Sequence, residues 1–364
     1  MKIALLAPAS SIHVVKWFNS LNELGHQVHL ISLHKPIPSN PALNYEERLH
    51  LLTTSSPIGY ISNVTRLKQI LNTIQPDILN VHYATGYGLL GRLCNFHPML
   101  LSVWGSDIYE FPNKSCFHKN LLIRNLKSSD SIASTSTCMS IETQKLTPNS
   151  PIYVTPFLIN TNLFKPSTEY EYKNTKTIRI GTVKGLKKIY GIDLLLNAFK
   201  IVNTQLPEYS FELCIAGAGS EHDKLIDLTK KLKLTNVNFI GLIPNSEVPH
   251  LLSTFDIFVA LSRQESFGVA LLEAGACGIP VVASEAEGFK EVIKNDITGL
   301  IVPIENHYAA AEAIIKLVQC PEKRKLIGEA ACQFVSTEYS SDACVSKMIY
   351  ALSQTIDKFK HEKL

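Results

Sequence analysis

The sequence has 364 residues, of which 45% are hydrophobic and 18% are charged. This composition excludes a disulfide mini-protein, a disordered chain and a coiled coil, and the length favours two domains. With 35 basic and 32 acidic residues the charge nearly balances, so no nucleic-acid partner is expected. No apolar run reaches the ~18 residues that a membrane span needs. The eight cysteines include no C-x-x-C pair, which argues against a zinc site.

Short apolar runs alternate with helical periodicity through the first half of the chain. Strands are predicted at 2–8, 28–32, 77–83, 99–104, 131–134 and 152–156, with a helix at 12–24. Near-continuous apolar strands separated by helices indicate a parallel sheet covered on both faces. The proline-rich segment 36–57 is predicted to be irregular. Because the first apolar run leads directly into a helical pattern, it indicates a buried strand rather than a cleaved leader.

The polar segment 166–177 is the predicted linker, and the alternation restarts after it. Strands are predicted at 178–183, 211–217, 237–241, 256–261, 279–284 and 300–303, with helices near 191–205, 221–233, 267–277 and 287–294. Helical patterns continue from about 306 to the C-terminus. We therefore predict an α/β chain with two doubly wound parallel-sheet domains, at 1–170 and 171–335, and a helix at 336–364 that returns to the first domain.

The densest chemical signal is the segment SRQESFGVALLEAGACGIPVVAS, residues 262–284. Glu265 and Glu273 stand on either side of a predicted helix start, and between them lie Ser266, Phe267, Gly268 and Val269. Free backbone amides at a helix N-terminus bind anions such as phosphate. Glu273 would then accept hydrogen bonds from ribose hydroxyls, and Glu265 would face the group attached beyond the phosphate. The pattern predicts a site for a nucleotide sugar; two ordinary surface acids on a solvated helix are the alternative.

A basic loop follows the strand predicted at 178–183. Lys184 and Lys188 are candidates to neutralise a donor diphosphate, because charge-assisted contacts stabilise a departing phosphate. Gly217 follows the next strand, where it either allows a phosphate to approach the backbone or makes a tight turn. For the lysines the alternative is a solvated basic loop.

Four residues of the first half are candidates for the acceptor side, since ligands of parallel sheets bind beyond the C-terminal ends of the strands. Ser11 and His13 follow the first strand, His82 ends the strand at 77–83, and Asp107 follows the strand at 99–104. A core histidine and a turn-capping aspartate are the alternatives for His82 and Asp107. The segment 117–127 is a basic amphipathic pattern, which suits either an anionic membrane surface or an ordinary solvated helix.

The E-x7-E segment resembles the signature of the retaining glycosyltransferases of family 4, which have the GT-B fold of two Rossmann-like domains. Six further segments occur in the order of that family: WGSDIY (104–109), VTPFLINTNLFKP (154–166), GTVKGLKKIYGIDLLLNAF (181–199), IAGAGSE (215–221), EGFKEVI (287–293) and ITGLIVP (297–303). The resemblance covers nearly the whole chain. The chain departs from the family pattern at Trp104, Leu158, Asn160, Thr182 and Tyr190, where His, Gly, Asp, Arg and Lys are usual.

The resemblance implies a retaining, metal-independent glycosyltransferase without a cofactor. Its partners would be a UDP- or GDP-linked sugar on the C-terminal domain and a glycan or polyprenyl-diphosphate-linked acceptor on the N-terminal domain, in bacterial cell-surface polysaccharide synthesis. Glu265, Lys184 and Asp107 are the expected catalytic residues. The expected location is the cytoplasm, with peripheral contact with the inner membrane. The alternatives are a GT-B sugar-nucleotide epimerase, a degenerate nucleotide-sugar-binding protein, and a bilobal binding protein without catalysis.

Overall fold

The chain forms two compact units in the computed structural model, which describes residues 1–38, 40–167 and 177–362. One unit comprises Met1–Leu158 and Ser341–Leu364, and the other comprises Ile159–Ser340. The sequence places the boundaries at 170 and 335; most of the predicted linker, 166–177, lies outside the described residues. In the second unit, the Ile159 amide donates to the Tyr339 carbonyl (2.8 Å), and Ile159 pairs with Ser340 in an isolated parallel bridge. The segments that enter and leave this unit are therefore hydrogen-bonded to each other.

The first unit contains a parallel sheet of seven strands in the order β3-β2-β1-β4-β5-β6-β7. The strands are β1 (Lys2–Leu6), β2 (Gln27–Ser32), β3 (Leu49–Leu51), β4 (Ile78–His82), β5 (Met99–Val103), β6 (Ser131–Ser134) and β7 (Ile152–Val154). The α-helices are α1 (Ile12–Glu23), α2 (Gly59–Ser62), α3 (Val64–Ile74), α4 (Gly86–Cys94), α5 (Ser106–Tyr109), α6 (Cys116–Lys127), α7 (Thr137–Leu146) and α15 (Ser341–His361).

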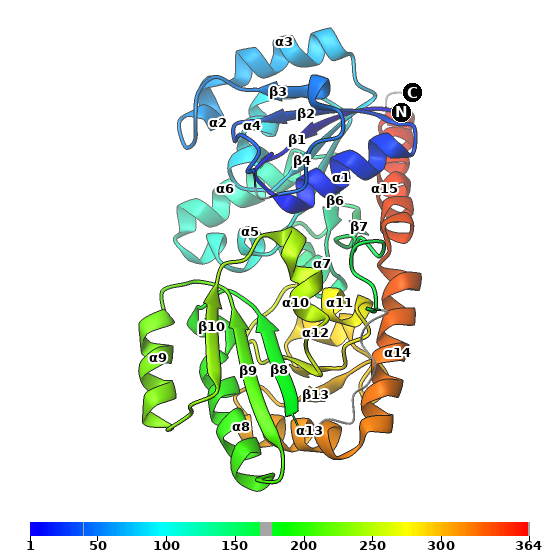
Figure 1. Cartoon of the computed structure of the whole chain (residues 1–364). Coiled ribbons are helices and arrows are strands. Elements are labelled where there is room, and N and C mark those ends of the chain that lie inside the picture. Colours follow the sequence, from blue (N-terminus) through cyan, green and yellow to red (C-terminus); the bar gives the residue numbers. More distant parts are fainter. Residues whose placement is uncertain (39, 168–176, 363–364) are drawn as a thin grey trace. The chain divides into compact units, whose positions relative to one another are not determined.

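Both faces of this sheet are buried, as its apolar strands predict. Ala4 and Leu6 of β1 point into a core completed by residues of α3, α4 and α6, whereas Ile3 and Leu5 are buried on the opposite face. The C-terminal helix α15 contacts α1, β4 and β5, and Figure 1 shows α1 and α15 side by side. None of the described helices, α15 included, is long and apolar enough to cross a membrane.

The prediction of an irregular segment at 36–57 is wrong in part. This segment contains the 3₁₀ helix η1 (Glu46–Arg48) and strand β3, which pairs with β2 at the edge of the sheet. A strand of three residues is too short to show a periodicity of its own, and the prolines that precede it suggested a loop throughout. Edge strands are the place where such short pairing is tolerated.

The second unit contains a parallel sheet of six strands in the order β10-β9-β8-β11-β12-β13. The strands are β8 (Thr177–Val183), β9 (Ser210–Ala216), β10 (Val237–Gly241), β11 (Ile257–Ala260), β12 (Val281–Ser284) and β13 (Leu300–Val302). The α-helices are α8 (Ile192–Gln205), α9 (His222–Lys231), α10 (Val248–Leu252), α11 (Val269–Ala276), α12 (Glu287–Val292), α13 (His307–Gln319) and α14 (Pro321–Glu338). This unit also contains the 3₁₀ helices η3 (Lys188–Tyr190) and η4 (Asn245–Glu247), and the first unit contains η2 (Phe111–Asn113). The prediction of two doubly wound parallel sheets is confirmed.

Candidate functional site

The order of strands in the second sheet reverses between β8 and β11. From β8 the chain continues to β9 and β10 on one side, whereas β11 leads to β12 and β13 on the other. The loops that follow these two neighbouring strands therefore diverge, and such a switch point is where open α/β sheets bind ligands. Lys184 begins the loop after β8, and Glu265 lies in the loop after β11.

An ion pair joins these two loops. The Lys184 Nζ atom lies 2.5 Å from Glu265 Oε2, and each side chain is only 14% exposed. The same ammonium lies 4.8 Å from the centre of the Tyr190 ring and 5.9 Å from that of Phe289. The Ser262 hydroxyl lies 3.5 Å from the same Glu265 oxygen. The structure thus brings together two residues that the sequence analysis selected independently.

The loop 265–268 leads into helix α11 and is held by the start of α12. Gly268 has φ +122°, and a Cβ there would lie 2.9 Å from the Phe289 ring. The Gly288 amide donates to the Glu265 carbonyl (3.1 Å), and a Cβ at Gly288 would approach the Phe267 nitrogen to 2.4 Å. Both glycines are required for this close packing. The amides predicted to bind phosphate therefore stand at the N-terminus of α11, next to a fixed Glu265.

Glu273 and Phe267 are the buried members of this segment. Glu273 lies within α11 and is 8% exposed, which is unusual for a glutamate. Phe267 is 3% exposed and its ring lies 5.8 Å from that of Tyr339. The Phe267 side chain therefore belongs to the core, and its backbone remains the candidate for ligand contact.

Gly217 supports the Lys184 loop from the neighbouring strand. It has φ +144°, and a Cβ at this position would lie 1.9 Å from the Lys184 carbonyl oxygen. The Lys184 amide in turn donates to the Ala216 carbonyl (2.9 Å). The structure thus requires glycine at 217 because the Lys184 backbone lies against it, and the approach of a phosphate to Gly217 stays a prediction.

Arg263, which no sequence motif indicated, connects the two loops. Its guanidinium donates to both carboxylate oxygens of Asp193 (2.9 and 2.7 Å), to Glu305 and to the Lys188 carbonyl. Burial favours the neutral acid, but the Arg263 guanidinium outweighs it and lowers the pKa of Asp193. The Lys188 side chain itself is exposed. Arg263 belongs to no periodic pattern and is not a motif residue, so the sequence did not indicate its role.

In the first sheet the strand order reverses between β1 and β4, and three of the acceptor-side candidates lie at this point. Ser11 is the residue before α1, His13 lies in its first turn, and His82 ends β4. The His13 ring stacks on that of Phe157, with 4.0 Å between the ring centres, and lies nearly perpendicular to the Trp104 ring, with 6.0 Å between the centres. His82 lies 5.5 Å from the same Trp104 ring. We call His13, His82, Trp104 and Phe157 the aromatic cluster.

Both histidines of the aromatic cluster are neutral. Burial lowers the pKa of His82 to about 3, and burial together with the nearby Lys16 charge lowers the pKa of His13 to about 3. His82 Nε2 lies 2.7 Å from Asn80 Oδ1, so Nε2 carries the proton and Nδ1 is an acceptor. In the described part of the chain neither Nδ1 atom has a hydrogen-bond partner.

Asp107 has a structural role that its motif also allowed. Its carboxylate is fully buried and accepts hydrogen bonds from the amides of Ala84 (3.0 Å), Trp104 (3.0 Å) and Gly105 (2.8 Å). Burial raises the pKa of Asp107, although the amides partly offset that effect. The side chain therefore holds the turn after β5 in place, and its assignment as a catalytic residue stays a prediction.

Asn160 also has a structural role. Its Oδ1 atom accepts hydrogen bonds from the Asn162 amide (3.1 Å) and the Leu163 amide (3.2 Å). An asparagine makes this turn as well as an aspartate does, so the departure from the family residue preserves the local backbone.

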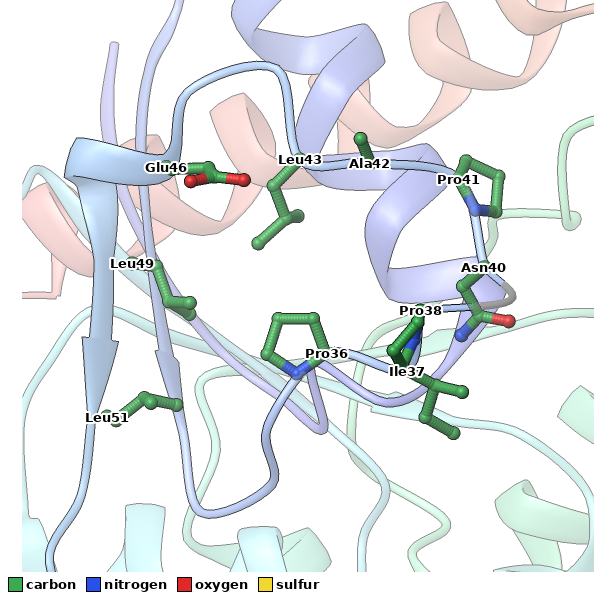
Figure 2. A pocket seen from close by; sticks show the side chains of 10 residues that line it. All are labelled: Pro36, Ile37, Pro38, Asn40, Pro41, Ala42, Leu43, Glu46, Leu49 and Leu51. Carbon is green, nitrogen blue, oxygen red and sulfur yellow. The ribbon is translucent and has the colours of Figure 1, made fainter.

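A groove of about 560 Å³ lies elsewhere in the first unit, between the segments 36–38 and 40–43 on one side and β3 on the other (Figure 2). Apart from Asn40 and Glu46, its lining is apolar: Pro36, Ile37, Pro38, Pro41, Ala42, Leu43, Leu49 and Leu51. None of the described residues that line it carries a cationic side chain that could neutralise a diphosphate.

Comparison with known proteins agrees with the fold and the motifs. Residues 167–334 match the family "Glycosyl transferases group 1", and residues 2–136 match "Glycosyl transferase 4-like". N-acetyl-alpha-D-glucosaminyl L-malate synthase of Bacillus anthracis is 26% identical over 345 residues, which cover 90% of this chain and 89% of that protein. These matches extend over both units.

Solved structures show the same fold. Sucrose-phosphate synthase from Thermosynechococcus elongatus aligns with a TM-score of 0.81 and 18% identity, over 97% of this chain and 98% of that one. The Anabaena protein HepE, in complex with UDP and glucose, aligns with a TM-score of 0.78 and 17% identity over 97% and 99% of the two chains.

The two parallel sheets and the two family matches define the class of this protein: it is a glycosyltransferase of the GT-B fold. Its motifs and its pair of matched domains are consistent with glycosyltransferase family 4. Among solved structures of the same fold is the lipopolysaccharide outer core galactosyltransferase WaaB, which aligns with a TM-score of 0.70 and 14% identity over 97% and 99% of the two chains.

Proposed function

We propose that this glycosyltransferase is retaining and metal-independent, and that it moves a sugar from a UDP- or GDP-linked donor to a glycan or lipid-linked oligosaccharide in bacterial surface polysaccharide synthesis. The observation that carries the proposal is the Lys184–Glu265 pair, which lies at the switch point of the second sheet beside the N-terminus of α11.

The donor would bind through complementary groups at this point. The amides of 266–269 and the Lys184 ammonium neutralise the diphosphate, which is the role that helix N-termini and cations play at phosphate sites. Glu273 holds the ribose hydroxyls, and Glu265 holds hydroxyls of the sugar. The complex of HepE with UDP and glucose, a protein of the same fold, supports a nucleotide-sugar donor.

The reaction would depend on charge stabilisation of the leaving group. As the sugar–phosphate bond breaks, negative charge grows on the diphosphate, and Lys184 and the α11 amides stabilise it. The acceptor hydroxyl attacks the face from which the diphosphate leaves, and a phosphate oxygen removes its proton. The configuration of the anomeric carbon is then retained. No protein carboxylate forms a covalent bond, in contrast to retaining glycosidases.

The acceptor would bind to the first unit at the aromatic cluster. His13 and His82 are neutral, and their Nδ1 atoms are buried and have no hydrogen-bond partner among the described residues. They would bind a sugar hydroxyl only after a side-chain movement that exposes them. The basic side chains near α6, which are Lys114, Lys119, Arg124 and Lys127, are all exposed. With Phe117, which is 71% exposed, they support peripheral contact with the cytoplasmic face of a membrane.

The test is a transfer assay with the full chain, using UDP-glucose, UDP-N-acetylglucosamine and GDP-mannose with membrane-extracted lipid-linked acceptors. We expect release of the nucleoside diphosphate in the presence of a chelator and an α-linked product from an α-linked donor, as read from the anomeric proton coupling. The variants Glu265→Ala and Lys184→Ala should lose transfer. Wild-type rates in both variants would overturn the proposal.

Two other outcomes of the same assay correspond to different functions. Interconversion of the donor sugar without any acceptor would show an epimerase. Binding of the nucleotide without transfer to any acceptor would show a degenerate, non-catalytic protein.

A further inference from the structure

We infer that Tyr190 is a positioning residue of the donor site, whose ring holds the Lys184 ammonium where the diphosphate of the donor binds. The inference rests on the proposed function, because it concerns the same lysine. Tyr190 is one of the positions at which the chain departs from the pattern that its motifs otherwise follow.

The contact between the two side chains is a cation–π interaction. The Lys184 Nζ atom lies 4.8 Å from the centre of the Tyr190 ring, within the ~6 Å over which such contacts are significant. The lysine side chain is only 14% exposed. Water therefore screens the contact less than it screens one at the open surface.

Backbone hydrogen bonds hold the segment that carries the ring. Tyr190 ends η3, where its amide donates to the Lys187 carbonyl (2.9 Å). The Arg263 amide donates to the Ile189 carbonyl (2.7 Å), which joins η3 to the loop that carries Glu265. A Cβ at Gly185 would lie 3.2 Å from the Tyr190 ring, so the ring lies directly against the Lys184 loop.

Gly191 fixes the end of the same turn. It has φ +65°, and a Cβ there would lie 2.0 Å from the Leu261 carbonyl oxygen. Only glycine fits this approach. The segment that carries the Tyr190 ring therefore packs against Leu261, the residue after β11, and is hydrogen-bonded to Arg263 in the loop that carries Glu265.

Glu265 and Tyr190, two of the groups that contact the Lys184 ammonium, differ in what they do when a diphosphate binds. Glu265 is an anion, so it competes with phosphate for the ammonium, and in the proposed reaction it turns to the sugar hydroxyls. The Tyr190 ring is neutral and attracts the ammonium through its π face. It can therefore keep the ammonium in place while the carboxylate is exchanged for phosphate. A lysine at position 190 would instead repel Lys184.

The test compares two ligands that differ by one phosphate. Dissociation constants are measured by calorimetry for UDP and UMP, and for GDP and GMP, with the wild type and with Tyr190→Phe, Tyr190→Leu, Lys184→Ala and the double variant of Lys184→Ala and Tyr190→Leu. Tyr308→Leu, which removes an exposed tyrosine of the same unit (65% exposed), is the matched control. Thermal unfolding of each variant verifies that it is folded.

We expect Tyr190→Leu to reduce the preference for the diphosphate over the monophosphate by roughly 5- to 10-fold, the range of a partly desolvated cation–π contact. Tyr190→Phe keeps the ring and should stay within about 2-fold of the wild type. In the Lys184→Ala background, Tyr190→Leu should have no further effect, because the ring acts through the lysine. Tyr308→Leu should leave the preference unchanged.

Three results would overturn the inference. One is equal weakening of diphosphate and monophosphate binding by Tyr190→Leu, which would indicate a general structural effect. Another is a loss in Tyr190→Phe as large as that in Tyr190→Leu. The third is an undiminished effect of Tyr190→Leu without Lys184. If the wild type binds neither diphosphate, the proposed function itself fails, and this is seen before any variant is made.

Discussion

The two partners of the Lys184–Glu265 pair should affect nucleotide binding in opposite directions. Lys184→Ala removes the cation that meets the diphosphate. Glu265→Gln keeps the shape of the side chain but removes the anion that competes for that cation. If the pair lies in the donor site, the first variant weakens binding of a nucleoside diphosphate, and the second does not.

The expected size follows from the geometry. Two unit charges 2.5 Å apart attract each other by ~7 kcal/mol at an effective dielectric constant of ~20, but desolvation offsets most of this. An exposed ion pair contributes up to ~1 kcal/mol to stability, and the disruption of a buried pair costs ~3–5 kcal/mol. Since both side chains are 14% exposed, the contribution of this pair should fall between these two values. We expect Lys184→Ala to lower the free energy of unfolding by about 1–3 kcal/mol.

Ligand binding should separate the variants more clearly than stability does. Loss of a charge-assisted hydrogen bond to phosphate costs ~1.5–3 kcal/mol, which corresponds to roughly 10- to 150-fold weaker binding of the diphosphate by Lys184→Ala. Glu265→Gln should bind it equally well or several-fold more tightly, yet it should lose sugar transfer.

The assay is calorimetric titration with UDP and GDP at low salt, combined with transfer rates. The reasoning would be refuted if Glu265→Gln weakened diphosphate binding as much as Lys184→Ala does. The ion pair would then be a structural unit rather than a competitor for the ligand.

Three further predictions concern residues that shape the two candidate sites: Gly191, His82 and Asp107. Gly191→Ala should lower the free energy of unfolding by more than ~2 kcal/mol, because the new Cβ would lie 2.0 Å from the Leu261 carbonyl oxygen. Gly241 has φ +75° and no atom within 4 Å of an added Cβ, so Gly241→Ala should cost only ~1 kcal/mol of backbone strain. Urea unfolding compares the two variants, and equal losses of stability would contradict the packing argument. His82 has a pKa of about 3 in the folded chain and of ~6.5 when unfolded, so the unfolded state binds more protons between these values and stability falls as the pH is lowered through that range. Between about pH 7 and pH 5 the wild type should lose ~2 kcal/mol more than His82→Gln does, and parallel pH profiles would argue against a buried neutral imidazole. Asp107→Asn puts an amide donor among backbone amides and should cost ~1–3 kcal/mol of stability while diphosphate binding is kept; loss of binding in a stable variant would speak against the structural role.

The fold was predictable because its strands are apolar on both faces. Runs such as IALL in β1 and VVAS in β12 are buried along their whole length, and segments with helical periodicity separate such runs. This combination occurs almost only in parallel α/β sheets. Strand β3 was missed because three residues carry no periodicity, and its pairing depends on the neighbouring strand β2 rather than on its own sequence.

The sequence predicted which types of residue form the candidate donor site, but it predicted only some of the contacts between them. Glu265 and Lys184 were selected from separate motifs, and topology brings them together because β8 and β11 are neighbours in the sheet. Tyr190 was noted only as a departure, and Arg263 was not noted at all. Their roles depend on distances across loops, which no spacing along the chain reveals.

The acceptor side shows the same limit. His82 was left open between a ligand contact and a core histidine. In the structure it is 1% exposed, yet its Nδ1 atom has no hydrogen-bond partner among the described residues. Burial alone thus does not decide between the two readings of a histidine at the end of a strand.

The most direct test of the central claim is hydrogen–deuterium exchange of the full chain, with and without UDP or GDP, and each with and without a chelator. Whichever of the two diphosphates binds should slow amide exchange at 184–191 and 265–273, which follow β8 and β11. The exchange rates at 8–17 should stay unchanged. Slowed exchange confined to other segments, or protection that disappears with the chelator, would contradict a metal-free donor site built on Lys184 and Glu265.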